Sequence, residues 1–217
     1  MWSKKEKMEQ LKGFGIVPFA KGALFNMLRT YKSPNDKVSA LIENGDIISL
    51  KNGLYVVSEK HRSEKLIIEL IANQIYGPSY VSLDSALAYY GLIPEKVSVV
   101  SSICSKRSRK FKNSLGHFYY FSAKPDYFEI GVNSISIDNR HHFLMASIEK
   151  AICDKIIFTQ NLNIVSIKSM ELFLVENLRF DFSGIQEFDF SIIEKCIECG
   201  IKTKALTLLL KYFKTII

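Results

Sequence analysis

The sequence has few of the cysteines that stabilise small extracellular domains, and it lacks the long apolar runs that span membranes. Its 217 residues include four cysteines, five prolines and one tryptophan. No window approaches the roughly 18 continuous apolar residues of a transmembrane helix, and four cysteines are too few for a disulfide scaffold. The first residues, Met1 to Lys5, are polar, unlike the start of a secretory signal. These absences favour a cytoplasmic protein that binds no membrane.

Signatures of catalysis are also missing. The sequence has no phosphate-cradling Gly-rich loop, no Gly-x-Ser-x-Gly elbow and no His-Glu-x-x-His motif. Cys196 and Cys199 have CxxC spacing, but no second pair lies at ligand spacing, and the segment has the pattern of a helix interior. His141 and His142 are adjacent, so they point to different sides, and no carboxylate pattern completes a site. We therefore expect no metal, no cofactor and no catalytic residue.

Composition indicates a globular protein with a polyanionic partner. Hydrophobic residues make up 47% of the chain and charged residues 24%. A chain of this composition is too apolar to be disordered. The formal net charge is +7 and the pI is about 9.1, and phosphate neutralisation by Lys and Arg dominates nucleic-acid affinity. A chain of 217 residues favours two domains.

The first third of the chain predicts a winged helix-turn-helix. Apolar residues recur at helical spacing over residues 21–28 and again over residues 35–43, where Ser33 and Pro34 precede the helix and Asn44-Gly45 ends it. Two β-rich runs, residues 47–50 and 54–57, flank Asn52-Gly53, a strong hairpin signal. Two helices followed by a hairpin give a recognition helix and a wing.

The rest predicts an α+β domain with an antiparallel sheet and a helical C-terminal region. We place a DNA-binding domain at residues 1–76 and the second domain at 77–217, because Gly77-Pro78 follows a bridging helix over residues 63–76. The expected strands cover residues 97–103, 117–123, 127–132 and 134–137. The expected helices cover residues 80–94, 143–158, 166–178, 190–199 and 202–212.

The candidate DNA-binding residues lie around the recognition helix and the wing. At or near the N-terminal end of the helix are Lys32, Ser33, Asn35, Lys37 and Ser39, and in the wing are Lys51 and Asn52. Asn35 could pair with adenine, Lys37 could reach guanine or phosphate, and the wing could touch the backbone. The acids Asp36 and Asp46 oppose this unless they cap backbone amides. The alternative is a winged helix used only for protein contacts.

A second basic segment lies between two expected strands. Residues 105–112 contain five basic side chains and no acid, among them Lys106, Arg107, Arg109 and Lys110. This segment could clamp a phosphate backbone or an acidic protein, or it could be a solvated hairpin loop. The aromatic run at residues 118–121 could stack bases, but alternating aromatics in a central strand favour a core.

Several blocks of the sequence together resemble AbiEi-type antitoxins of bacterial abortive-infection systems. They are NGDIISLKNGLY at residues 44–55, YGPSYVSLDSAL at 76–87, YYGLIPE at 89–95, SKRSR at 105–109, Leu115-Gly116, Phe118-Tyr119-Tyr120 and ASIEKAICDK at 146–155. The resemblance covers about residues 38–157. Ser147 stands where the family has proline. We expect Glu149, Lys150 and Asp154 in the same block to be structural, with an i, i+4 ion pair worth a few tenths of a kcal/mol.

The resemblance implies a repressor and antitoxin. The winged helix would bind promoter inverted repeats of its own operon, aided by basic residues of the second domain. That domain would neutralise a cognate nucleotidyltransferase-like toxin in phage defence. The expected state in solution is a monomer, and cooperative association on DNA stays open. One alternative is a stand-alone regulator without a toxin. The other is an enzyme, which the sequence disfavours because Glu187 and Asp189 lack the Gly-Ser turn of a nucleotidyltransferase.

Overall fold

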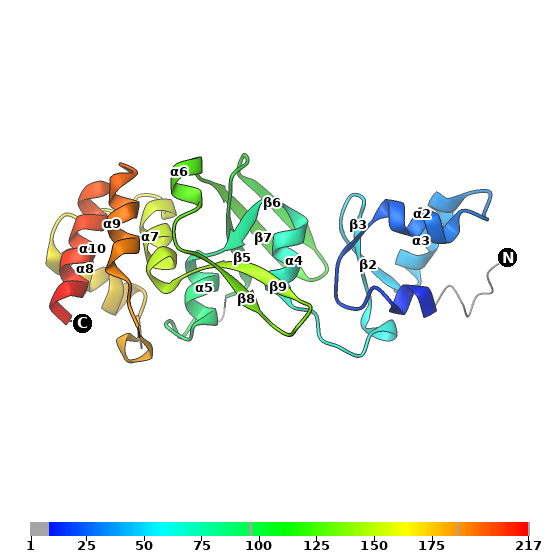
Figure 1. The fold of residues 1–217 in the computed structure, drawn as a ribbon, viewed down its shortest axis with the longest axis horizontal. Coiled ribbons are helices and arrows are strands. Elements are labelled where there is room, and N and C mark those ends of the chain that lie inside the picture. The colour runs from blue at the N-terminus through cyan, green and yellow to red at the C-terminus, as the bar shows by residue number, and fades with distance from the viewer. Residues whose placement is uncertain (1–8, 96, 186, 217) are drawn as a thin grey trace.

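A computed structural model of the chain describes residues 9–95, 97–185 and 187–216. Helices and two sheets give an α+β fold, as the sequence predicts. Figure 1 shows an elongated molecule in which an N-terminal unit, a central sheet and the C-terminal helices follow one another along the long axis. The polar segment at residues 1–5 lies outside the described residues. Within those residues, no helix is both long and apolar enough to cross a bilayer.

The N-terminal unit, residues 9–57, contains the expected helices and hairpin. Its small antiparallel sheet has the strand order β1-β3-β2. The elements are β1 (Phe19–Ala20), α2 (Lys21–Leu28), α3 (Pro34–Glu43), β2 (Ile47–Lys51) and β3 (Leu54–Val57). Pro34 occupies the first turn of α3, but the side chain of Ser33 before it makes no capping hydrogen bond. Gly45 (φ +68°) ends α3, and Gly53 (φ +78°) closes the hairpin, both in the left-handed region.

The small sheet is buried on both faces. Successive side chains of a strand point to opposite faces, and in β3 Tyr55 and Val57 join the core beneath α2 and α3, whereas Val56 joins the larger core of the rest of the molecule. Leu50 of β2 and Ile16 join that larger core as well. The N-terminal unit is therefore docked against the second unit, residues 68–216, by the back of its own hairpin.

The large sheet of the second unit is mixed, so the expectation of an antiparallel sheet is wrong. Its strand order is β6-β7-β5-β4-β9-β8. The strands are β4 (Ser79–Val81), β5 (Val99–Cys104), β6 (Arg109–Asn113), β7 (Gly116–Ser122), β8 (Val132–Ser136) and β9 (His142–Ala146). The pairs β5–β7 and β4–β9 are parallel. After β5 the chain passes to the sheet edge as β6, and β7 then returns between β6 and β5. Side-chain alternation identifies such strands but not the direction of their partners.

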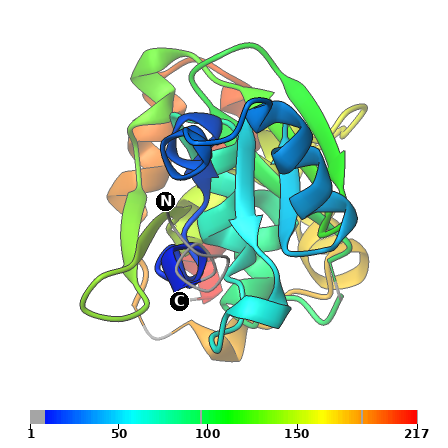
Figure 2. The same ribbon diagram turned by 90° about the vertical axis from the view of Figure 1, so that its right-hand side faces the viewer.

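Helices cover both faces of the large sheet. The α-helices are α4 (Ile68–Ile75), α5 (Leu83–Tyr89), α6 (Pro125–Phe128), α7 (Ile148–Phe158), α8 (Ile167–Leu172), α9 (Phe190–Glu198) and α10 (Thr203–Ile216). Shorter elements are η1 (Glu59–His61), the π-helical η2 (Phe173–Asn177) and η3 (Phe182–Gly184). In β7, the Tyr120 hydroxyl donates to the Ala72 carbonyl of α4 at 2.6 Å. The neighbouring Phe121 ring lies 5.8 Å from that of Phe158 in α7. Because neighbouring strand residues face opposite ways, α4 and α7 lie on opposite faces. The end-on view in Figure 2 places the N-terminal unit in front of this sheet.

Several element bounds differ from those expected. The bridging helix begins at Ile68 rather than near Ser63. Tyr80, expected to open a helix over residues 80–94, lies in β4, and the helix α5 begins at Leu83. The expected strand over residues 127–132 is mainly α6 and a turn, and residues 142–146 form β9 instead of opening a helix. Short aromatic and β-branched segments fit a strand or a helical turn equally well, which explains these errors. The helices from α8 onward lie where helical periodicity predicts them.

Helix α7 begins where a serine supplies the cap. Ser147 precedes the helix, and its hydroxyl accepts a hydrogen bond from the Lys150 backbone N–H at 3.3 Å. A side-chain cap of this kind satisfies one of the unpaired N–H groups at a helix start. The departure from proline at this position is therefore compatible with a well-defined helix start. The proposed division at residues 76 and 77 stays a prediction, although α4 itself packs on the large sheet.

Candidate nucleic-acid interface

Helix α3 presents a polar face to solvent and is anchored by its opposite face. Val38 is 4% exposed and packs into the small core. On the other side, the sequence-predicted residues Lys32, Ser33, Asn35, Lys37 and Ser39 are all exposed. The ammonium of Lys37 lies 5.1 Å from the centroid of the Tyr31 ring. Lys32 and Ser33 thus precede α3, Asn35 and Lys37 lie in its first turn, and Ser39 lies near its middle.

The two predicted wing residues differ in their surroundings. Asn52 is exposed at the tip of the β2–β3 turn. Lys51 is half-buried, and its Nζ donates a 2.6 Å hydrogen bond to the carbonyl of Ile75 at the end of α4. A cation at the C-terminal end of a helix is favourable, because unpaired carbonyls point there. Lys51 therefore joins the two units, and reaching phosphate would require it to leave this site.

The basic run is a turn and an edge strand rather than the loop expected between two strands. Residues 105–108 turn the chain, and Arg109 and Lys110 lie in β6, at the edge of the large sheet. Lys106 and Arg109 each lie 5.7 Å from the Tyr76 ring centroid, and Lys110 lies 4.6 Å from that of Tyr119. Cation–π contacts of this kind hold long side chains in place while leaving their charge exposed.

Other contacts in the run involve its backbone and the neighbouring turn. Lys106 donates from Nζ to the Gly77 carbonyl at 2.7 Å, and the Tyr76 hydroxyl donates to the Arg107 carbonyl at 3.1 Å. The side chains of Lys106, Arg107, Arg109 and Lys110 are exposed. Lysines on an edge strand also protect a sheet from pairing with other chains, which is the structural alternative for this segment.

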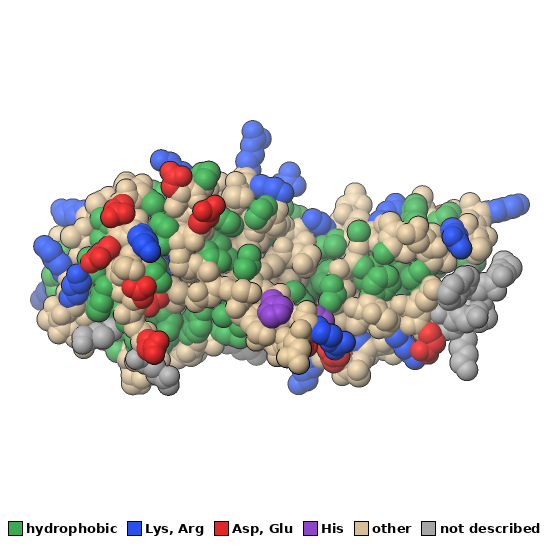
Figure 3. All heavy atoms as spheres, in the orientation of Figure 1, with side chains coloured by type: hydrophobic (Ala, Val, Ile, Leu, Met, Phe, Trp, Pro, Cys, Tyr) green, Lys and Arg blue, Asp and Glu red, His purple; other side chains and the backbone are tan. Residues whose placement is uncertain are grey.

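The hairpin and the basic edge strand lie next to each other. Strand β2 packs beside β6, and Asn113 at the end of β6 donates from Nδ2 to the Leu50 carbonyl at 3.0 Å. On the face drawn in Figure 3, Lys and Arg side chains protrude over the β6 region and the N-terminal unit and also over the C-terminal helices, where several Asp and Glu side chains lie among them. The hairpin and the basic edge strand, far apart in sequence, are therefore neighbours in the fold. Sequence reasoning missed Tyr76 and Asn113, because only the fold reveals their partners.

Asp46 and Asp36, the two acidic residues that oppose DNA binding, have different surroundings. Asp46 lies 2.7 Å from His61 Nε2, with 19% of its side chain exposed, so it is occupied by that contact. Asp36 is exposed in the first turn of α3 and makes no side-chain cap. A carboxylate there interacts favourably with the helix dipole. Of these two acids, Asp36 is the one whose carboxylate is open to solvent.

Away from this surface, α7 contains the i, i+4 ion pair that the sequence predicts, and the structure shows that it is buried. Lys150 Nζ lies 3.4 Å from Asp154 Oδ1, and both side chains are 0% exposed. Asp154 accepts hydrogen bonds from the hydroxyls of Ser82 and Tyr127, both at 2.6 Å, and Lys150 donates to the Tyr127 carbonyl at 2.8 Å. Burial raises the pKa of Asp154, although Lys150 opposes the shift. The cluster ties the start of α5, α6 and α7 together, and its energetics are those of a buried pair.

The other residues considered from the sequence are spread through the fold. Cys196 is buried in α9 and Cys199 is the C-cap of that helix. The aromatic run lies in β7, where Phe118 and Tyr120 are 0% and 2% exposed, which confirms their place in the core. Glu149 is 5% exposed and accepts the backbone N–H of Asp189 at 2.8 Å.

Comparison with family models and with curated proteins finds no match to the chain.

Proposed function

We propose that this protein is a DNA-binding regulator whose N-terminal unit acts as a winged helix-turn-helix. In this proposal α3 enters the major groove and the β2–β3 turn lies over the adjacent backbone. The observation that carries it is the exposed polar end of α3, with Asn35, Lys37 and Ser39 on a helix fixed by Val38. Asparagine pairs with adenine in two hydrogen bonds, and lysine pairs with guanine or phosphate.

The second part of the proposal is that β6 extends the DNA-binding surface. Lys106, Arg107, Arg109 and Lys110 are exposed beside the hairpin, because β2 and β6 pack together. Such side chains would contact phosphates without reading sequence. Because the back of the hairpin packs on the second unit, its exposed turn at Asn52 is the part that would contact DNA.

We further propose that the protein is an AbiEi-type antitoxin that represses its own operon and neutralises a nucleotidyltransferase-like toxin in the cytoplasm. The support is the resemblance of the sequence blocks between residues 38 and 157. In this proposal residues 1–76 bind promoter inverted repeats, residues 77–217 form the antitoxin domain, and the protein is a monomer in solution. It has no catalytic activity of its own.

A mobility-shift assay with the full-length protein and the intergenic DNA upstream of its gene tests the regulatory function. We expect a specific complex whose affinity falls steeply with salt, because phosphate contacts release counterions. Binding equal to that of unrelated DNA of the same length would contradict the proposal. Metal-dependent nucleotide transfer or DNA cleavage by the purified protein would also contradict it.

Co-expression with the neighbouring gene tests the antitoxin function separately. We expect that gene to encode a nucleotidyltransferase whose toxicity this protein relieves. Specific DNA binding without any such toxin would leave the stand-alone regulator as the better description.

A further inference from the structure

The connection between the two units is held firmly to the end of α3. We call residues 58–67 the strap. Lys60 Nζ donates to the Asn44 carbonyl at 2.6 Å, and His61 Nε2 lies 2.7 Å from Asp46 Oδ1. Asn44 follows directly after the last residue of α3, and Asp46 lies two residues further along the chain. The position of the strap and the position of this helix are therefore linked.

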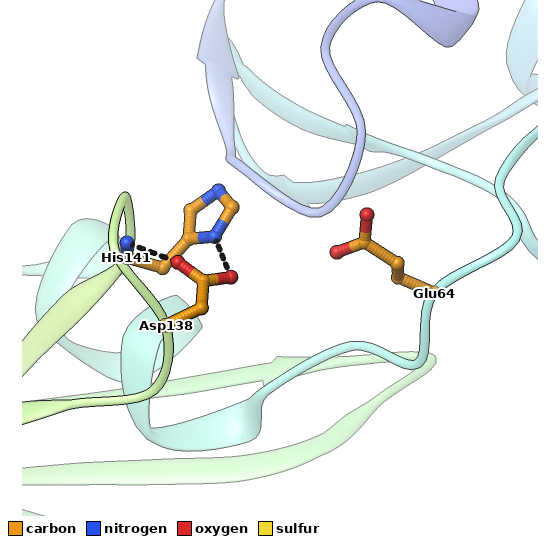
Figure 4. A group of neighbouring side chains, drawn as sticks. All are labelled: Glu64, Asp138 and His141. Atoms are coloured by element: carbon orange, nitrogen blue, oxygen red, sulfur yellow. Dashed lines mark hydrogen bonds and ion pairs between the residues drawn. The ribbon is translucent and has the colours of Figure 1, made fainter.

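At its other end the strap meets the β8–β9 turn of the second unit. Figure 4 shows the Glu64 carboxylate facing Asp138 and His141 across a gap. One ligand atom of each residue lies within 4.8 Å of those of the other two. His141 Nδ1 lies 2.7 Å from Asp138 Oδ2, and Asp138 Oδ1 accepts the backbone N–H groups of Arg140 and His141 at 2.7 and 2.8 Å.

We propose that Glu64, Asp138 and His141 bind a divalent transition-metal ion of the Zn²⁺ class. One imidazole with two carboxylates is a donor set that suits Zn²⁺ and its neighbours better than Mg²⁺ or Ca²⁺. Three protein ligands leave a fourth position for water. His141 would bind through the Nδ1 lone pair, so its ring would carry the proton on Nε2.

Metal binding requires an adjustment at both sides of the gap. His141 Nδ1 and Asp138 Oδ2, now 2.7 Å apart, would give up their hydrogen bond and its proton and move apart. Zinc–ligand distances of about 2.0–2.2 Å bring the donor atoms to roughly 3–4 Å from one another. Glu64 has 53% of its side chain exposed, and it can close the remaining distance by rotation. His141 has only 14% of its side chain exposed, and the backbone N–H groups hold Asp138 in place. Such hydrogen bonds orient ligands in metal sites.

The charges at the gap are compatible with a bound cation. Two carboxylates face each other across the gap, and both would attract a positive ion placed between them. Arg140 Nη2 lies 3.9 Å from Glu64, but 74% of its side chain is exposed, so its screening is weak. A dication between the carboxylates would neutralise both.

A metal at this site would fix the strap to the β8–β9 turn and thereby restrict α3 relative to the second unit. This consequence for DNA binding rests on the proposed function, whereas the binding of metal does not. The two are therefore tested by different measurements.

Isothermal titration of the full-length, chelator-treated protein with ZnCl₂ tests the site. We expect one site per chain, weakened at least ~10-fold in Glu64→Gln and in His141→Ala, since even outer-shell changes cost about 10- to 100-fold. Glu64→Gln changes an exposed side chain, so this variant keeps the test valid if His141→Ala folds poorly. His142→Ala is the matched control, because this neighbouring histidine is exposed in β9, and it should bind like the wild type.

Hydrogen exchange supplies a second readout. Zinc should slow exchange in residues 59–65 of the wild type and leave it unchanged in Glu64→Gln. Absence of zinc binding, equal affinity in all variants, or an equal loss in His142→Ala would overturn the site. DNA binding need not be measured for any of these outcomes.

Discussion

At the residue scale, the lysines of the proposed interface differ in what their ammonium groups contact. Lys51 donates to the end of α4, whereas Lys37 lies over the Tyr31 ring with its charge exposed. The hydrogen bond of Lys51 is already satisfied within the protein. The charge of Lys37 remains available to a phosphate.

We therefore expect Lys37→Ala and Lys51→Ala to have different effects on DNA binding and on stability. Lys37→Ala should weaken DNA binding and reduce the slope of log affinity against log salt by about one unit. Lys51→Ala should leave the slope nearly unchanged and lower stability by about 0.5–2 kcal/mol, because it removes a hydrogen bond and a charge from a helix end. Fluorescence anisotropy across a salt series and urea unfolding measure the two effects. An unchanged slope in Lys37→Ala would contradict its assignment.

Asp138 gives a prediction of pH dependence. The hydrogen bond from His141 and those from backbone N–H groups lower the pKa of Asp138 from 3.8 to about 2. A carboxyl pKa that is lower in the folded state contributes stability above its unfolded value, and the contribution is lost as pH falls from about 4 to 2. Asp138→Asn should therefore be less stable than the wild type at pH 7, with the difference shrinking toward pH 2. Urea unfolding at several pH values measures it, with exposed Asp126→Asn as control, and a constant difference would refute it.

At the element scale, α7 depends on its buried ion pair. Asp154→Ala would leave the Lys150 ammonium buried without its carboxylate, which typically costs about 3–5 kcal/mol. Lys155→Ala breaks the more exposed pair of the same helix with Asp84, whose side chains are 18% and 38% exposed, and should cost at most about 1 kcal/mol. Chemical denaturation of both variants compares the pairs. Equal losses would show that burial of the first pair is energetically unimportant.

The elements also show how far the sequence predicts the fold. Local signals suffice for α3 and the hairpin, because Pro34, Gly45 and Gly53 each fix a backbone conformation that few other residues favour. Strand direction in the large sheet is set by partners distant in sequence, so the parallel pairing of β5 with β7 could not be predicted from alternation.

In the candidate site, too, local features could be predicted from the sequence, whereas contacts between distant segments could not. The exposed face of α3 follows from helical periodicity, since Val38 marks the buried side. The contact of Lys51 with Ile75, and the proximity of Glu64 to His141, depend on how the units pack. No local pattern carries that information.

At the scale of the whole molecule, the central proposal is that polar and basic side chains of both units contact the same DNA duplex. The hairpin is buried on both faces and packs beside β6. The α3 side chains would supply base contacts, and the basic side chains of residues 106–110 would supply phosphate contacts. These two classes have different signatures, because base contacts discriminate among sequences and phosphate contacts do not.

The most direct test measures the affinity of the full-length protein for its upstream DNA and for unrelated DNA of equal length, in three variants. Asn35→Ala should lose about 1–3 kcal/mol on the upstream DNA only. Replacement of Lys106, Arg107, Arg109 and Lys110 by alanine should weaken both complexes alike, and Lys168→Ala on remote α8 should change neither. Equal affinities of wild type and Asn35→Ala for the upstream DNA, or no effect of the four-residue replacement, would contradict the account.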